Sequence, residues 1–122
     1  MVKIENMTED GGYIINVQPR LKSVYMNVRG RFTPELADQF HIDYQKQIGS
    51  ISTFSYVLEI DCREIKTVNP QLNQKLACSF ELFKRSGFKK IDFQLSEQSI
   101  IKPLIDETAK QVALPNYQLT IR

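Results

Sequence analysis

The stretch SVYMNVRGRFTPELADQFHIDY, residues 23–44, predicts a β-strand that leads directly into an amphipathic helix. Its first part alternates apolar with polar or aromatic residues, and this period of two is typical of a strand with one buried face. The apolar positions of that strand are Val24, Met26 and Val28. The segment Thr33-Pro34-Glu35 then supplies a hydroxyl N-cap, a proline at the first helical position and an acid near the positive end of the helix.

The same alternation of strand and helix continues on both sides of this stretch. Residues 13–17 form a short β-prone run, and the link over residues 18–22 is short enough for an antiparallel hairpin. Further along, Asn69-Pro70 repeats the pairing of a capping residue with a helix-starting proline. The later strands are expected at residues 55–60, 89–95 and 117–121, the later helices at residues 69–86 and 99–112, and a connecting loop at residues 62–68.

The resulting order, β-β-α-β-α-β-α-β, predicts the α/β class. Right-handed strand–helix–strand units place their strands parallel in one sheet, and the opening hairpin adds an antiparallel strand at an edge. We therefore expect a single mixed, mostly parallel sheet of about five strands, with three helices mainly on one face. Residues 13–122 are assigned to one domain, and the polar residues 1–12 to a flexible lead-in outside it.

Composition and charge exclude several classes of protein. The 122 residues are 42% hydrophobic and 25% charged, as in globular domains, and the net charge of +2 is too small to favour a nucleic-acid partner. No apolar run approaches the roughly 18–20 residues of a membrane span, and residues 1–12 have no apolar region typical of a signal peptide. Cys62 and Cys78 fit neither a disulfide framework nor a zinc site. We therefore expect a cytoplasmic protein with reduced thiols.

The order and length of these elements resemble those of the STAS domain, the fold of bacterial anti-sigma factor antagonists and of related stressosome and transporter modules. Two local features carry the resemblance. The strand that ends in Val28-Arg29-Gly30 runs into a capped helix, and the hydrophobic strand from Tyr56 ends in Asp61, shortly before the second helix. The resemblance extends from about Tyr13 to Ile121.

At the start of the second helix the chain departs from the family pattern. STAS antagonists carry Asp-Ser-Ser-Gly or a similar sequence there, and a partner kinase phosphorylates the second hydroxyl. The matching stretch here is Val68-Asn69-Pro70-Gln71-Leu72. Asn69 can replace the capping Asp, but Pro70 and Gln71 stand in place of the two hydroxyl residues and cannot accept phosphate. The resemblance therefore implies a relative that is not switched by phosphorylation at the usual place.

The resemblance also implies a function and a surface. STAS antagonists bind other proteins, so the expected partner is an anti-sigma factor kinase or another STAS protein, and we expect no catalytic activity, cofactor or metal. In the family the partner surface surrounds the start of the second helix. Carried over to this sequence, the partner-binding residues are Thr67, Asn69, Pro70 and Gln71, with Phe32 and Thr33 at the start of the first helix nearby.

Other functions remain open. Some STAS-like relatives hold a small molecule or lipid between the sheet and its helices, and this is the main alternative. An enzyme built on Asp61, Cys62 and His41 is disfavoured, because nothing near the cysteine in the sequence lowers a thiol pKa. Asp61 at a strand end can instead hydrogen-bond the backbone of the following loop. An uncovered sheet face or a bare edge strand also leaves a homodimer open.

Overall fold

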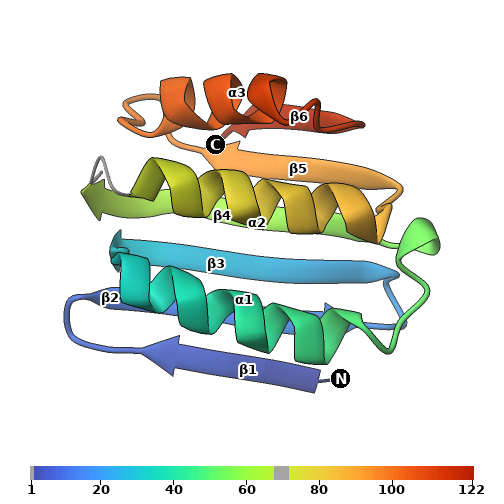
Figure 1. Ribbon diagram of the computed structural model, residues 1–122. Helices are drawn as coiled ribbons and strands as arrows, with labels where there is room; N and C mark the ends of the chain where they lie inside the picture. The colour runs from blue at the N-terminus through green and yellow to red at the C-terminus, as the bar shows by residue number, and fades with distance from the viewer. Residues whose placement is uncertain (1, 68–71) are drawn as a thin grey trace.

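The computed structural model describes residues 2–67 and 72–122, which form a layer of strands with a layer of helices on one side (Figure 1). The strands are β1 (Val2–Met7), β2 (Gly11–Gln18), β3 (Ser23–Arg31), β4 (Val57–Thr67), β5 (Lys90–Leu95) and β6 (Tyr117–Ile121). The helices are α1 (Pro34–Ile48), α2 (Leu72–Ser86), α3 (Lys102–Gln111) and the short 3-10 helix η1 (Thr53–Ser55).

The strands form one mixed sheet, and its order follows the chain from β1 to β6. The pairs β1–β2 and β2–β3 are antiparallel, whereas β3–β4, β4–β5 and β5–β6 are parallel. The helices α1, α2 and α3 lie side by side on the same face of the sheet (Figure 1). The predicted α/β class is confirmed, with a sheet of six strands where about five were expected.

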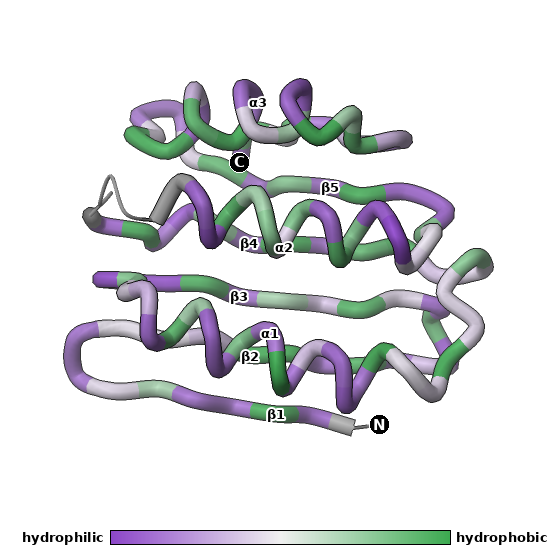
Figure 2. The backbone as a smooth tube through the Cα atoms, viewed as in Figure 1, coloured by the Kyte–Doolittle hydropathy of each residue, from purple (hydrophilic) through white to green (hydrophobic). Residues whose placement is uncertain are grey.

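The start and the buried side of α1 agree with the sequence pattern. The Thr33 hydroxyl oxygen accepts a hydrogen bond from the backbone N–H of Leu36 at 3.2 Å, and Pro34 lies in the first turn. Gly49 caps the other end through its N–H, which donates to the carbonyl of Gln45. In Figure 2 the apolar residues recur at intervals along each helix, as expected for helices with one buried side. The apolar residues that α1 buries are Ala37, Phe40, Tyr44 and Ile48.

The strand expected to end near Asp61 is longer than predicted. Residues 62–67, expected as part of a loop, continue β4 and pair with the end of β3, where Glu64 lies opposite Arg29. The prediction was wrong because β3 itself runs on to Arg31 and provides a partner for these residues. Two irregularities in the β3–β4 register accommodate Gly30, whose φ of 71° favours glycine. A Cβ atom there would stand 2.2 Å from the carbonyl oxygen of Asp10.

The segment expected to be a lead-in outside the fold contributes the first strand. Val2–Met7 forms β1, which pairs with β2 so that Ile4 lies opposite Ile15 and Asn6 opposite Tyr13. The prediction was wrong because an edge strand draws its stability from the strand beside it, which the polar composition of residues 1–12 does not reveal.

The remaining ends differ from the expectation by a few residues. The structure describes α2 from Leu72 onward, so the expected helix start at Asn69-Pro70 lies outside the described residues. The helix α3 begins at Lys102 rather than near residue 99, and Pro103 lies in its first turn. The strands from residues 56 and 91 lie side by side, since Leu58 of β4 pairs with Ile91 of β5.

Candidate interaction site at the carboxyl edge of the sheet

The parallel strands end, and the helices begin, along the same edge of the sheet (Figure 1). We call it the carboxyl edge; among the described residues it contains Arg31 and Thr67, which end β3 and β4, and the first turns of α1 and α2. The starts of helices carry partial positive charge and free N–H groups. In open α/β sheets, binding sites are found at this edge.

Two of the predicted partner-binding residues, Phe32 and Thr33, hold the start of α1 in place. The Thr33 hydroxyl oxygen is engaged as the helix cap. The Phe32 side chain is 8% exposed, and its ring packs edge-on against the rings of Tyr13 and Phe40, with centroids 6.3 Å and 6.5 Å away. Phe32 therefore packs into the core beneath the carboxyl edge, and little of its side chain is accessible to a partner.

The other predicted residues belong to the junction between β4 and α2. Thr67 is the last residue of β4 and pairs with Arg31 of β3. Asn69, Pro70 and Gln71 lie outside the described residues. The structure therefore brings the ends of β3 and β4 together at the start of α1, and the role of the junction itself stays a prediction.

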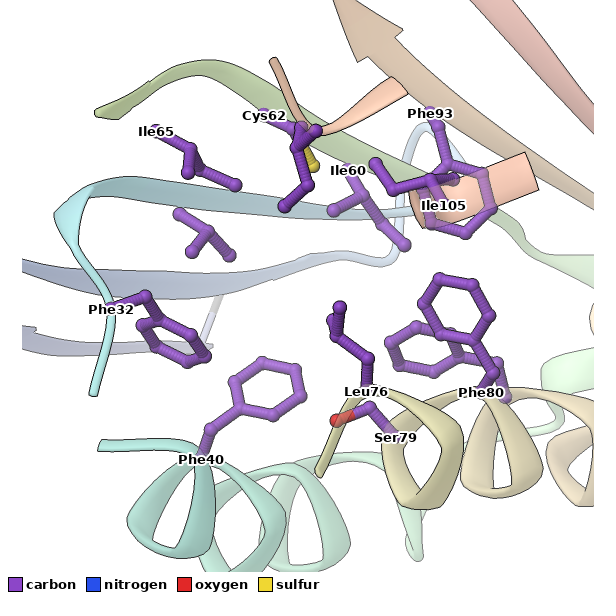
Figure 3. Close-up of a pocket in the computed structure, with 13 residues that line it drawn as sticks. Phe32, Phe40, Ile60, Cys62, Ile65, Leu76, Ser79, Phe80, Phe93 and Ile105 are labelled. Atoms are coloured by element: carbon purple, nitrogen blue, oxygen red, sulfur yellow. The ribbon is translucent and has the colours of Figure 1, made fainter. Parts of the chain in front are cut away.

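A small apolar cavity lies behind the carboxyl edge, between the sheet and the three helices (Figure 3). Its volume is about 50 Å³, and Ser79 and the Cys62 thiol are the polar side chains that line it within the described chain. Pockets that hold drug-sized ligands measure about 300–1,000 Å³. As the structure stands, this cavity has room for water-sized molecules and not for a lipid or a cofactor.

The Cys62 thiol points into this cavity (Figure 3) and is buried. The residue is 6% exposed, and burial, together with the nearby charge of Asp61, raises the pKa of the thiol to about 12. A thiol needs a lowered pKa to act as a nucleophile near neutral pH. The Cys62 side chain therefore acts as a small apolar group of the core.

Asp61 points to the opposite face of the sheet, because successive side chains of a strand alternate. Its carboxylate accepts two hydrogen bonds from the Arg63 guanidinium, at 3.0 and 2.9 Å, one from the Arg63 backbone N–H at 3.1 Å and one from the Tyr25 hydroxyl at 3.1 Å. Burial acts to raise the pKa of Asp61, but these hydrogen bonds outweigh it and hold the pKa below its ordinary value. Asp61 was expected to end a strand and bond to the backbone of the following loop; it does accept from the backbone N–H of Arg63, but both residues belong to β4.

The guanidinium of Arg63 was missed in the sequence, although Asp61 and Arg63 stand two residues apart and so share one face of a strand. That signal was lost because residues 62–68 were expected to form a loop.

His41 connects two helices and does not approach Asp61 or Cys62. Its Nε2 atom lies 2.6 Å from the hydroxyl oxygen of Ser79 on α2. The Ser79 hydroxyl also lies within hydrogen-bond distance of the carbonyl of Lys75, at 3.1 Å, and the tautomer of the imidazole decides which group donates between His41 and Ser79. Burial lowers the pKa of His41, which favours the neutral ring. The hydrogen-bond partner of the His41 ring is thus Ser79, and the structure does not pair His41 with the Cys62 thiol as the enzyme hypothesis requires.

The described chain also offers no metal centre. Within residues 2–67 and 72–122, no three side chains of His, Cys, Asp or Glu gather closely enough to hold a metal ion. None of the helices in the same two ranges combines the length and the apolar character needed to cross a membrane.

Comparisons with family models, with curated proteins and with solved structures find no match to this chain.

Proposed function

We propose that this protein is a non-enzymatic cytoplasmic module that binds another protein through the carboxyl edge of its sheet. The partner class is the one implied by the resemblance to STAS antagonists: an anti-sigma factor kinase or another STAS protein. The centre of the proposed surface is the stretch from Thr67 to Gln71, in which Pro70 and Gln71 stand at the two positions that carry hydroxyls in STAS antagonists. Recognition is therefore not switched by phosphorylation at those two positions.

The observation that carries the proposal is the packing behind the carboxyl edge. The cavity between the sheet and the helices measures about 50 Å³, whereas drug-sized ligands need about 300–1,000 Å³. Phe32 and Phe40 fill the interior directly below the start of α1. The start of α1, which this packing holds in place, loses little conformational entropy on docking, and this favours recognition of another folded surface.

The state of the polar groups supports the same proposal. Thr33, Asp61 and His41 are each engaged in hydrogen bonds within the chain, and the Cys62 thiol is protonated near neutral pH. These groups contribute to the fold, and the Cys62 thiol has neither the lowered pKa nor the partner base of an activated nucleophile.

The test is calorimetric titration with the anti-sigma factor kinases and STAS proteins encoded in the source genome. Asn69→Lys should weaken binding by at least about tenfold, because a new charge enters the proposed contact. Ser50→Lys is the matched control, since Ser50 is exposed just beyond the far end of α1. Melting temperatures should stay within a few degrees. Equal affinity of the parent and Asn69→Lys would exclude this surface, and failure of every such protein to bind would overturn the proposed partner class.

The main alternative, a ligand between sheet and helices, is tested separately. Native mass spectrometry of freshly purified protein should show the mass of the bare chain. A co-purifying small molecule or lipid would favour the alternative, because the interior would then have to open well beyond the observed cavity.

A further inference from the structure

The two outermost strands of the sheet, β1 and β6, differ in how they are protected. Within residues 2–67 and 72–122, no strand pairs with the outer side of either β1 or β6. β6 is preceded by Pro115 and by Asn116, whose φ of 58° turns the chain just before the strand. β1 pairs with β2 over all of Val2–Met7 without a register irregularity. Proteins commonly protect free edges with prolines, bulges or charged side chains. β1 has no proline or bulge, and its two charged residues, Lys3 and Glu5, are exposed and of opposite sign.

The pairing of β1 with β2 shows which backbone groups face outward. The N–H of Thr8 donates to the carbonyl of Gly11, and hydrogen-bonded pairs alternate along an antiparallel ladder. The bonded pairs are therefore Asn6 with Tyr13 and Ile4 with Ile15. The N–H and C=O groups of Lys3, Glu5 and Met7 consequently point away from β2, towards the free edge.

These outward groups can pair with a second copy of β1 in antiparallel orientation. The charges select one register. If Lys3 pairs with Glu5 of the second copy, Glu5 also pairs with Lys3 of the second copy, and Ile4 faces its own equivalent. A shift by two residues in either direction would place Glu5 against Glu5 or Lys3 against Lys3, which is unfavourable. In the single chain the two side chains form an exposed ion pair, with Lys3 Nζ 3.7 Å from Glu5 Oε2.

We propose that this edge is a homodimer interface, in which β1 of one copy pairs with β1 of another about a two-fold axis at Ile4. Two sheets then join into one continuous sheet, with the helices of both copies on the same side. The axis relates identical surfaces, so the assembly closes as a dimer and does not grow into a fibre. At the free edge of β6 no pairing of charges would favour one register over another, because Tyr117–Ile121 carries no charged residue.

The helix side of the interface has an apolar contact at its centre. Ile4 shares a face of the sheet with the buried Ile15 and is itself only partly buried. In the proposed register the two copies of Ile4 form a non-hydrogen-bonded pair, in which side chains come closest. The dimer therefore covers the part of Ile4 that one chain leaves exposed. It also leaves the carboxyl edge free, so the interface is independent of the proposed function.

The first test exchanges the charges and measures dimerisation by sedimentation over a range of protein concentrations. Lys3→Glu and Glu5→Lys should each weaken self-association by about tenfold, since both cross-strand pairs become repulsive. An equal mixture of the two variants should recover association as a heterodimer, because every pair is then attractive. Lys89→Glu, at an exposed position outside the strands, is the matched control and should not change it.

The second test reads the register directly. Ile4→Cys in a Cys78→Ser background should form an interchain disulfide on mild oxidation, because paired Cβ atoms at the axis lie within reach of one another. Glu5→Cys in the same background should form it much more slowly. A protein that stays monomeric at all concentrations, a dimer unchanged by Lys3→Glu, or faster cross-linking of Glu5→Cys would overturn the proposal.

Discussion

At the centre of the sheet, side chains on both faces are buried, but they are shielded from water by different means. On the face under the helices, the side chains of Tyr13, Leu58 and Phe93 are at most 1% exposed because α1, α2 and α3 cover them. On the other face, Asp61 and Gln94 are 2% and 3% exposed although none of these helices lies there. The long polar side chains of that face cover one another, since neighbours on adjacent strands stand about 5 Å apart.

This contrast separates two kinds of stabilisation. Apolar burial under the helices has no direction and scales with the area removed from water. The other face, which α1, α2 and α3 leave uncovered, is called the open face. Its stability depends on specific hydrogen-bond donors and acceptors, as in the contacts that Arg63 and Tyr25 make with Asp61. Substitutions under the helices should therefore cost the most free energy, whereas those on the open face should cost less and depend on pH.

The largest effect should come from Phe93→Ala, under the helices. Phe93 is 1% exposed and its ring lies 5.1 Å from that of Phe80, so its removal leaves a cavity next to the existing one. We expect a loss of about 3–5 kcal/mol in the free energy of unfolding, measured by urea denaturation. Phe54→Ala, at a side chain that is 73% exposed, is the control and should cost about 0.5 kcal/mol or less. Equal effects of the two would contradict the described core.

The second effect concerns a buried hydrogen bond that joins β2 to α1. The Tyr13 hydroxyl donates to Asp43 at 2.5 Å and accepts from the amide of Asn6 at 3.3 Å. Tyr13→Phe keeps the ring and leaves the buried Asp43 with one donor fewer, so it should cost about 1–3 kcal/mol. A double-mutant cycle with Asp43→Ala should show coupling between the two sites. Additive effects would mean that the hydrogen bond contributes little.

A smaller effect is expected on the open face for Asp61→Asn. The substitution keeps the shape of the side chain but removes the negative charge that Arg63 contacts, so it should cost about 1–2 kcal/mol near pH 7. Thermal melts of parent and variant at pH 7 measure it. A variant as stable as the parent would show that the partly exposed Arg63 contributes nothing through this pair.

The contribution of Asp61 to the free energy of unfolding should fall as the pH decreases. The pKa of Asp61 is lower in the folded chain than its ordinary value, so the charged carboxylate stabilises the fold above that ordinary value of about 4. This stability is lost as the pH falls from about 4 through the lowered pKa. The parent should therefore lose more stability than Asp61→Asn between about pH 4 and pH 2. Parallel stability curves for the two proteins would contradict the assignment.

The smallest effect should come from Ser23→Ala at the other end of the open face. The Ser23 hydroxyl donates to Glu59 at 2.9 Å, and Glu59 is partly exposed, so water can replace the lost donor. We expect a cost of about 0.5–1 kcal/mol in urea denaturation. A loss as large as that of Phe93→Ala would mean that the open face contributes as much as the core.

The sequence was most informative where local chemistry decides structure. Thr33 and Pro34 predict the start of α1 because a cap and a first-turn proline act within a few residues. The alternation in β3 and the last strand at Tyr117–Ile121 were predicted for the same reason. The sequence-based prediction was wrong where pairing with a neighbouring strand determines the structure, as in β1 and in the extension of β4 to Thr67.

The candidate site was less predictable than the fold. Phe32 is close in sequence to the proposed surface, but its burial against Tyr13 depends on the packing of β2. The contact between His41 and Ser79 arises because α1 and α2 lie side by side, and no local pattern marks it. The size of the cavity also depends on many side chains at once. These features follow from tertiary packing, which spacing along the chain does not encode.

The most direct test of the account is a two-dimensional NMR titration of the isotope-labelled protein with an anti-sigma factor kinase or STAS protein that binds it. The account predicts that the largest amide shifts will fall at the carboxyl edge, from Arg31 to Thr33 and from Thr67 to Leu72. Shifts confined to the open face around Tyr25 and Gln94, with the carboxyl edge unchanged, would contradict it.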